Sequence, residues 1–162
     1  MAAGKQPKLL DPGSRAPDFR LPRLDGSIVA LQEILANGPA LIAFFKTTCP
    51  VCQLAFPFLE RIHQAGTLPV CAISQDDARD TREFNRQCGL TFPTLLDTAR
   101  SGFPVSNAFG ISSVPTTFLI ERDGGISRAI EGWSKREIEW LGGLAGVEVF
   151  RQGDNVPEWK AG

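Results

Sequence analysis

The sequence lacks long apolar runs, internal repeats, low-complexity segments and an excess of charge of either sign. Its longest apolar run, residues 40–45, is far shorter than the roughly 20 residues that cross a bilayer. The 17 basic and 18 acidic residues nearly balance, and the basic ones are scattered along the chain. These absences exclude a repeat array and a membrane-spanning helix, and they argue against nucleic acid as a partner.

Length and composition are typical of one globular domain: 162 residues, of which 43% are hydrophobic and 22% charged. Residues 1–15 are rich in Lys, Pro and Gly and predict a flexible lead-in. We expect a domain over residues 16–147 and an irregular C-terminal tail over residues 148–162. Because the N-terminus has no apolar signal core, we expect a monomeric cytoplasmic protein, or a periplasmic one if a signal peptide has been removed.

Apolar periodicity predicts an α/β fold with a mixed central sheet, helices on both faces and an N-terminal β-hairpin. The hairpin is expected within residues 17–31, around the turn Asp25-Gly26. Further strands are expected at residues 40–45, 68–73, 94–96, 116–121 and 126–131. One helix is expected directly after Cys49, and a second runs to about Cys88, with Asp76-Asp77 able to cap its start. A short helix is expected over residues 104–109, and a last helix begins at Ser134.

Cys49 and Cys52 form a C-x-x-C at a predicted strand-to-helix junction. A thiolate, not a thiol, attacks a disulfide. Unpaired backbone N–H groups and the dipole at a helix start favour an anion at Cys49, and Pro50 suits the first helical turn. The spacing places Cys52 one turn behind Cys49, within reach to close a disulfide or to release a mixed one.

The alternatives for this cysteine pair are an inert disulfide and a zinc site. A structural zinc needs four ligands, yet there is no second C-x-x-C and His63 is the only histidine. Cys71 falls in an apolar strand and Cys88 on the apolar side of a helix, where a free cysteine behaves as a small hydrophobic residue. We therefore expect redox chemistry, with no metal and no cofactor.

Residues 44–57 and 114–120 resemble the thioredoxin superfamily. Pro57 stands eight positions after Cys49, where thioredoxins carry a helix-kinking proline, and Val114-Pro115 is similar to the cis-proline element of the superfamily. Residues 13–19 with 24–26 are similar to the redoxin branch, the alkyl hydroperoxide reductase and thiol-specific antioxidant type. The resemblance implies a thioredoxin-like fold.

The resemblance also implies a thiol–disulfide oxidoreductase that acts on protein or small disulfides. Cys49 would attack and Cys52 would resolve the mixed disulfide; the partners would be a disulfide-containing protein substrate and an upstream thiol donor. Five residues are expected to contact the substrate: Thr48, Pro50, Val51, Val114 and Pro115.

Some positions depart from the pattern of the superfamily. Thr48 stands where thioredoxins usually have Trp, and Ala43 and Ala55 replace acids found six positions before or after the first cysteine in relatives. The proton-transfer group is therefore missing, while Lys46 is a candidate to stabilise a thiolate.

A thiol-dependent peroxidase with an antioxidant role is the alternative function. Peroxiredoxins resemble this chain, but they place a hydroxyl residue three positions before the reactive cysteine. Lys46 occupies that position relative to Cys49, and Cys49 itself occupies it relative to Cys52. In a peroxidase, Cys71 or Cys88 would be the resolving thiol.

Overall fold

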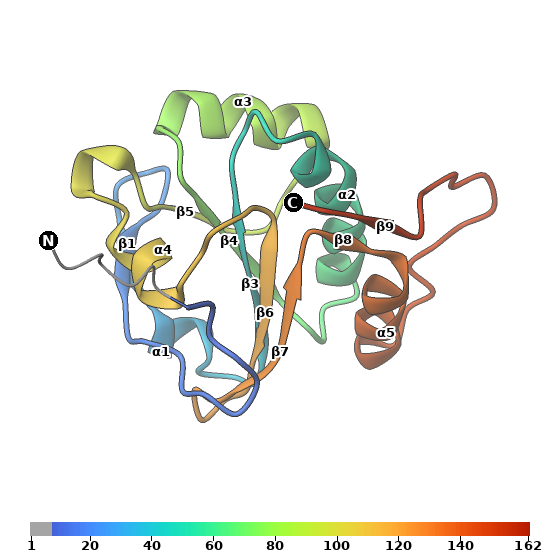
Figure 1. Cartoon of the computed structure of the whole chain (residues 1–162), viewed down its shortest axis with the longest axis horizontal. Coiled ribbons are helices and arrows are strands. Elements are labelled where there is room, and N and C mark those ends of the chain that lie inside the picture. Colours follow the sequence, from blue (N-terminus) through green and yellow to red (C-terminus); the bar gives the residue numbers. More distant parts are fainter. Residues whose placement is uncertain (1–7) are drawn as a thin grey trace, which may run out of the picture.

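Five strands form the central sheet, in the order β5-β4-β3-β6-β7 (Figure 1). This computed structural model describes residues 8–162. The sheet strands are β3 (Ala40–Phe45), β4 (Val70–Ser74), β5 (Thr94–Leu96), β6 (Thr116–Ile120) and β7 (Ile126–Glu131). Two small sheets are formed by β1 (Arg20–Pro22) with β2 (Ile28–Ala30), and by β8 (Trp133–Ser134) with β9 (Trp159–Lys160). The helices are α1 (Leu31–Ile34), α2 (Pro50–Gln64), α3 (Ala78–Cys88), α4 (Pro104–Phe109) and α5 (Lys135–Ala145), with a 3-10 turn η1 at Ala99–Ser101.

Strand directions confirm the predicted mixed sheet. β3 pairs in parallel with β4, which pairs in parallel with β5, whereas β3–β6 and β6–β7 are antiparallel. The N-terminal hairpin β1–β2 is also confirmed, with Leu21 opposite Val29. Parallel neighbours require crossover helices, and α2 and α3 supply them.

Two adjacent aromatic residues of β3 show that helices cover both faces of the sheet. Phe45 stacks on Phe56 of α2 at 4.6 Å and on Phe84 of α3 at 4.8 Å between ring centroids. Phe44 stacks instead on Phe109 of α4 at 5.1 Å. Successive strand residues point to opposite faces, so α2 and α3 lie on one face and α4 on the other.

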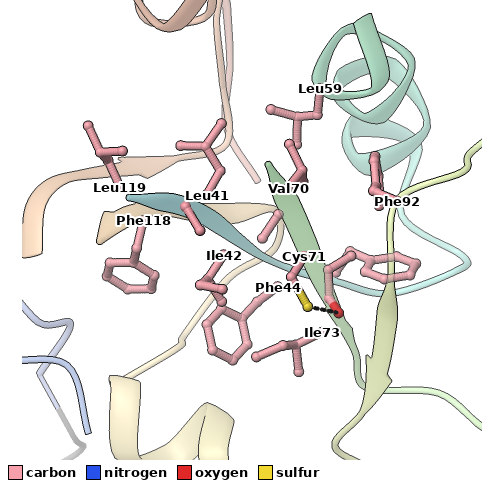
Figure 2. Packing of buried hydrophobic residues seen from close by; sticks show 14 of the residues in the cluster. Leu41, Ile42, Phe44, Leu59, Val70, Cys71, Ile73, Phe92, Phe118 and Leu119 are labelled. Atoms are coloured by element: carbon pink, nitrogen blue, oxygen red, sulfur yellow. Dashed lines mark hydrogen bonds between the residues drawn. The ribbon is translucent and has the colours of Figure 1, made fainter. Parts of the chain in front are cut away.

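The core is centred on β3, whose six residues are all buried. Figure 2 shows Leu41 with Val70 and Leu59 on one side of the sheet, and Ile42 and Phe44 on the other. A strand covered on both faces needs apolar side chains at every position, which is why residues 40–45 form a continuous apolar run. The loop that follows β3 is therefore attached to the buried centre of the fold.

Within residues 8–162, parts of the predicted lead-in and of the predicted tail are hydrogen-bonded to the rest of the fold. The lead-in falls partly outside the described residues, but the Leu10 N–H donates to the Phe109 carbonyl at 3.2 Å and the Gly13 N–H to the Ile126 carbonyl at 2.8 Å. The tail, predicted to be irregular, contains β9, which pairs antiparallel with β8. A strand of two residues is too short to produce an alternating pattern, which explains the difference.

Within residues 8–162, no helix combines the length and the apolar character that crossing a membrane requires.

Candidate active site

Cys49 occupies the N-cap position of α2, directly after the loop that leaves β3. Its Sγ accepts a hydrogen bond from the Cys52 N–H at 3.2 Å, in the place where a capping side-chain oxygen usually accepts. Pro50 is the first helical residue, where a missing N–H costs nothing. Cys49 is half-buried, and its sulfur accepts one of the first backbone N–H groups of the helix.

Cys52 lies one turn behind Cys49 and is fully buried. Burial, and to a smaller extent the hydrogen bond with Cys49, raises the pKa of the Cys52 thiol far above its usual range. Cys52 is therefore protonated at neutral pH and hidden from a bulky reactant. Of the two cysteines in the pair, only Cys49 is partly exposed to solvent.

The Val114–Pro115 peptide bond is cis and lies against the cysteine pair. The Cys49 thiol donates a hydrogen bond to the Val114 carbonyl at 3.4 Å. The Gly132 N–H donates to the Pro115 carbonyl at 2.7 Å, which ties this loop to the end of β7. The loop that holds the cis-proline therefore lies next to Cys49.

The other predicted contact residues belong to the loop and first turn around Cys49. Thr48 and Pro50 are exposed, and Val51 is half-buried. All three are neighbours of Cys49 in the chain and are at least partly exposed to solvent.

Asp76 contacts the loop that carries Cys49, whereas the sequence analysis predicted it to be a helix cap. Its carboxylate accepts a hydrogen bond from the Thr47 N–H at 2.7 Å, in the loop that carries Cys49. Of the two predicted helix caps, only Asp77 caps α3, by accepting from the Asp80 N–H at 2.9 Å. Because β3 and β4 are parallel neighbours, the loops at their carboxyl ends lie side by side, and this arrangement could have suggested the contact.

A polar cavity of about 200 Å³ lies beside Val114. Lys46, Gln75 and Ser106 are among the residues that line it. The Gln75 amide donates to the Ser106 hydroxyl at 3.0 Å, and that hydroxyl donates to the buried Asp97 carboxylate at 2.7 Å. This network fixes the start of α4 and gives the cavity a rigid wall.

Neither of the remaining cysteines lies on the surface beside Cys49. Cys71 packs in the core of Figure 2, its thiol facing the Ala72 carbonyl at 3.9 Å, and burial raises its pKa to about 12. Burial also raises the pKa of the half-buried Cys88. Residues 8–162 contain no group of three or more His, Cys, Asp or Glu side chains arranged to hold a metal ion.

The mixed sheet, the cysteine pair at a helix start and the facing cis-proline together define the class of the protein: a thioredoxin-fold thiol–disulfide oxidoreductase. A sequence model described as the AhpC/TSA family matches residues 12–129, and the chain belongs to this family.

Known relatives agree with this class. The chain is 31% identical over 129 residues to the thiol-disulfide oxidoreductase ResA of Geobacillus thermodenitrificans, covering 77% of this chain and 72% of the relative. It is 28% identical to a thio-disulfide isomerase from Thermus thermophilus, with a TM-score of 0.67 over 85% of this chain and 99% of that structure. The thioredoxin domain of a thiol-disulfide oxidoreductase from Bacteroides vulgatus, 19% identical, shares the fold with a TM-score of 0.73 over 85% of this chain and 99% of that domain. The predicted thioredoxin-like fold and the predicted enzyme class are confirmed.

Proposed function

We propose that Cys49 is the attacking nucleophile and Cys52 the resolving thiol in the reduction of disulfides within extended protein segments. The observation that carries this proposal is the asymmetry of the pair. Cys49 is accessible and receives the Cys52 N–H, whereas Cys52 is buried with a raised pKa.

The cycle consists of two exchange steps. The Cys49 thiolate attacks one sulfur of the substrate disulfide, so that a mixed disulfide forms and the other substrate sulfur leaves as a thiolate. That thiolate accepts a proton from solvent, and the Cys52 thiol loses its proton to solvent, because positions 43 and 55 carry no acid. Cys52 then attacks the Cys49 sulfur, which releases the second substrate thiolate. Two electrons pass to the substrate, and Cys49–Cys52 becomes the disulfide that an upstream dithiol donor must reduce.

Substrate placement follows from the backbone beside Cys49. The Val114 carbonyl lies 3.4 Å from the Cys49 sulfur, so a segment that pairs with Val114 as an added strand brings its own sulfur to Cys49. Pro115 holds this loop in position, and Thr48, Pro50 and Val51 contact the side chains next to the substrate cysteine.

A trapping experiment tests the order of the two cysteines. The Cys52→Ser variant should accumulate a mixed disulfide with a substrate peptide through Cys49, and mass spectrometry of the digested adduct locates the bond. Cys88→Ser is the matched control, because it removes a half-buried thiol outside the pair and should show normal turnover. An adduct through Cys52 in Cys49→Ser, but none through Cys49, would reverse the assignment.

The same two steps oxidise a dithiol when they run backwards, so the direction depends on the reduction potential. Proteins of this fold range from about −270 mV for reductants to about −120 mV for oxidants. Equilibration of the Cys49–Cys52 pair with glutathione buffers measures the value, and the proposal of a reductant requires one near the lower end.

A peroxidase is the alternative within this family. In residues 8–162, the Cys49 sulfur has hydrogen bonds with the Cys52 N–H and the Val114 carbonyl, and neither partner is a hydroxyl group that would orient a peroxide. We expect no catalytic loss of hydrogen peroxide when it is mixed with the reduced protein. Rapid turnover of peroxide would replace the proposed function with the alternative.

The monomeric state and the cytoplasmic location stay predictions. Sedimentation of the purified chain tests the first, and fractionation of cells that express the full-length protein tests the second.

A further inference from the structure

The C-terminal residues run back to the active site. The Trp133 indole donates to the Pro157 carbonyl at 2.6 Å, and β9 then pairs with β8, Lys160 opposite Trp133. Two residues further on, Gly162 packs against the cis-proline loop. A Cβ added to Gly162 would lie 2.6 Å from the Val114 carbonyl oxygen. Figure 1 shows the C-terminal end beside the start of α2.

Gly162 therefore occupies the position that a substrate strand would take. A Cα lies one bond of about 1.5 Å from its Cβ, so the Gly162 Cα is within about 4 Å of the Val114 oxygen. Paired strands lie about 4.8 Å apart, so an incoming backbone would overlap Gly162. A small disulfide has no such requirement, because it needs only the half-buried Cys49 sulfur.

The attachment of this segment is strong at one end and weak at the other. Trp133 is fully buried and stacks on Phe58 at 5.3 Å, so the clamp on Pro157 is firm. Beyond Pro157 every residue is exposed. The contacts are a ladder of two residue pairs, a hydrogen bond from the Lys135 N–H to the Glu158 carbonyl at 2.9 Å, a 3.6 Å ion pair between the same two residues, and packing of the Lys160 carbonyl on Gly132. Such contacts contribute little, so residues 159–162 can open while Pro157 stays attached.

We propose that residues 159–162, the C-terminal strap, determine which disulfides reach Cys49. The strap lies over the Val114 carbonyl and must leave before an extended polypeptide can pair there, whereas small disulfides react past it. The strap thus lowers the reactivity of Cys49 toward polypeptide disulfides relative to small ones. This inference rests on the proposed attack by Cys49 and adds a determinant of substrate choice to it.

Two probes with the same leaving group test the strap. One is a short unstructured peptide whose central cysteine is activated as the mixed disulfide with 5-thio-2-nitrobenzoate; the other is N-acetylcysteine amide activated in the same way. In each case the Cys49 thiolate bonds to the cysteine sulfur and the coloured thiolate leaves, so the rate of colour gives the second-order rate constant.

Two variants displace the strap by different means. One chain ends at Glu158, and the other carries Gly162→Val, whose Cβ would collide with the Val114 carbonyl. Gly143→Ala is the control substitution, since a Cβ there meets no atom within 4 Å. Thermal unfolding of each variant checks that the domain remains folded.

Both strap variants should react about tenfold faster with the peptide probe and at an unchanged rate with the small probe, because only molecules with an open strap react with the peptide. The control should match the parent chain on both probes. A peptide rate that stays the same or falls in the strap variants would overturn the inference. Failure of the proposed attack is distinguishable, because the parent chain would then not react with the small probe through Cys49.

Hydrogen exchange provides a second measurement. In Cys52→Ser trapped with the peptide, amide exchange in residues 159–162 should become faster than in the free protein. Unchanged or slower exchange there would show that the strap stays in place beside the bound peptide, and would contradict the inference.

Discussion

Removal of the Asp76 carboxylate tests whether the loop that carries Cys49 is held in place by the neighbouring β4 loop. In Asp76→Ala, the Thr47 N–H loses its 2.7 Å hydrogen bond and stays partly shielded from water. The Asp76 backbone N–H keeps its bond to the Ser74 hydroxyl at 3.1 Å, so the variant removes one contact of the loop and leaves the rest.

The size of the effect follows from the charge of the acceptor. A hydrogen bond to a charged group contributes about 1.5–3 kcal/mol to stability. One kcal/mol shifts the melting temperature of a domain of this size by about 2–4 °C. Asp76→Ala should therefore lower it by about 3–12 °C. Asp77→Ala, which loses only the cap of α3, should cost about 1 kcal/mol and about 2–4 °C.

Three readouts separate these two adjacent substitutions. Calorimetry gives the melting temperatures, hydrogen exchange gives the protection of the Thr47 amide, and a small disulfide gives the reaction rate of Cys49. Only Asp76→Ala should lose the Thr47 protection and react more slowly, because the loop that orients the sulfur gains freedom. Equal effects of the two substitutions on protection and rate would refute the role of Asp76 as the anchor of the site.

Two further predictions concern the buried thiols of Cys52 and Cys71. Resolution of the mixed disulfide should accelerate about tenfold per pH unit between about pH 7 and 9. The reason is that the pKa of Cys52 is raised, so its thiolate fraction still grows with pH in this range. Rapid-mixing measurement of the second released thiol tests this, and a rate that does not change with pH would contradict it. Cys71 has a folded-state pKa of about 12, above the usual value of about 8.5, so its contribution to stability is complete below pH 8.5 and decreases as the pH rises toward 12. Above about pH 9, Cys71→Ala should therefore reduce the pH dependence of the unfolding free energy by about 1.4 kcal/mol per unit, measured by urea titration, and an identical slope in both proteins would disprove the assignment.

Sequence analysis predicted well the elements whose local residue pattern directly reflects burial or a helix end. Residues 40–45 are apolar throughout because β3 is covered on both faces, and α4 begins and ends at the predicted residues 104 and 109. The position of Cys49 at a helix start was predictable because proline at the first helical position and a C-x-x-C are local signals.

The features that sequence analysis missed depend on contacts between distant residues. Asp76 and Thr47 are 29 positions apart, and nothing in either local sequence distinguishes Asp76 from a helix cap. Gly162 meets Val114 across an even longer stretch of chain, through a strand of two residues that has no periodicity. Such contacts follow from the sheet order, which local patterns do not specify.

The burial of Cys52 directly behind Cys49 has a kinetic consequence for the proposed cycle. Both sulfurs belong to one helical turn, so the second step is intramolecular, at an effective concentration of millimolar or more. The lifetime of the covalent complex with a substrate is then set by the protein itself and does not depend on how much free thiol surrounds it. A substrate bound through Cys49 is then released at the rate of the intramolecular step within the first turn of α2.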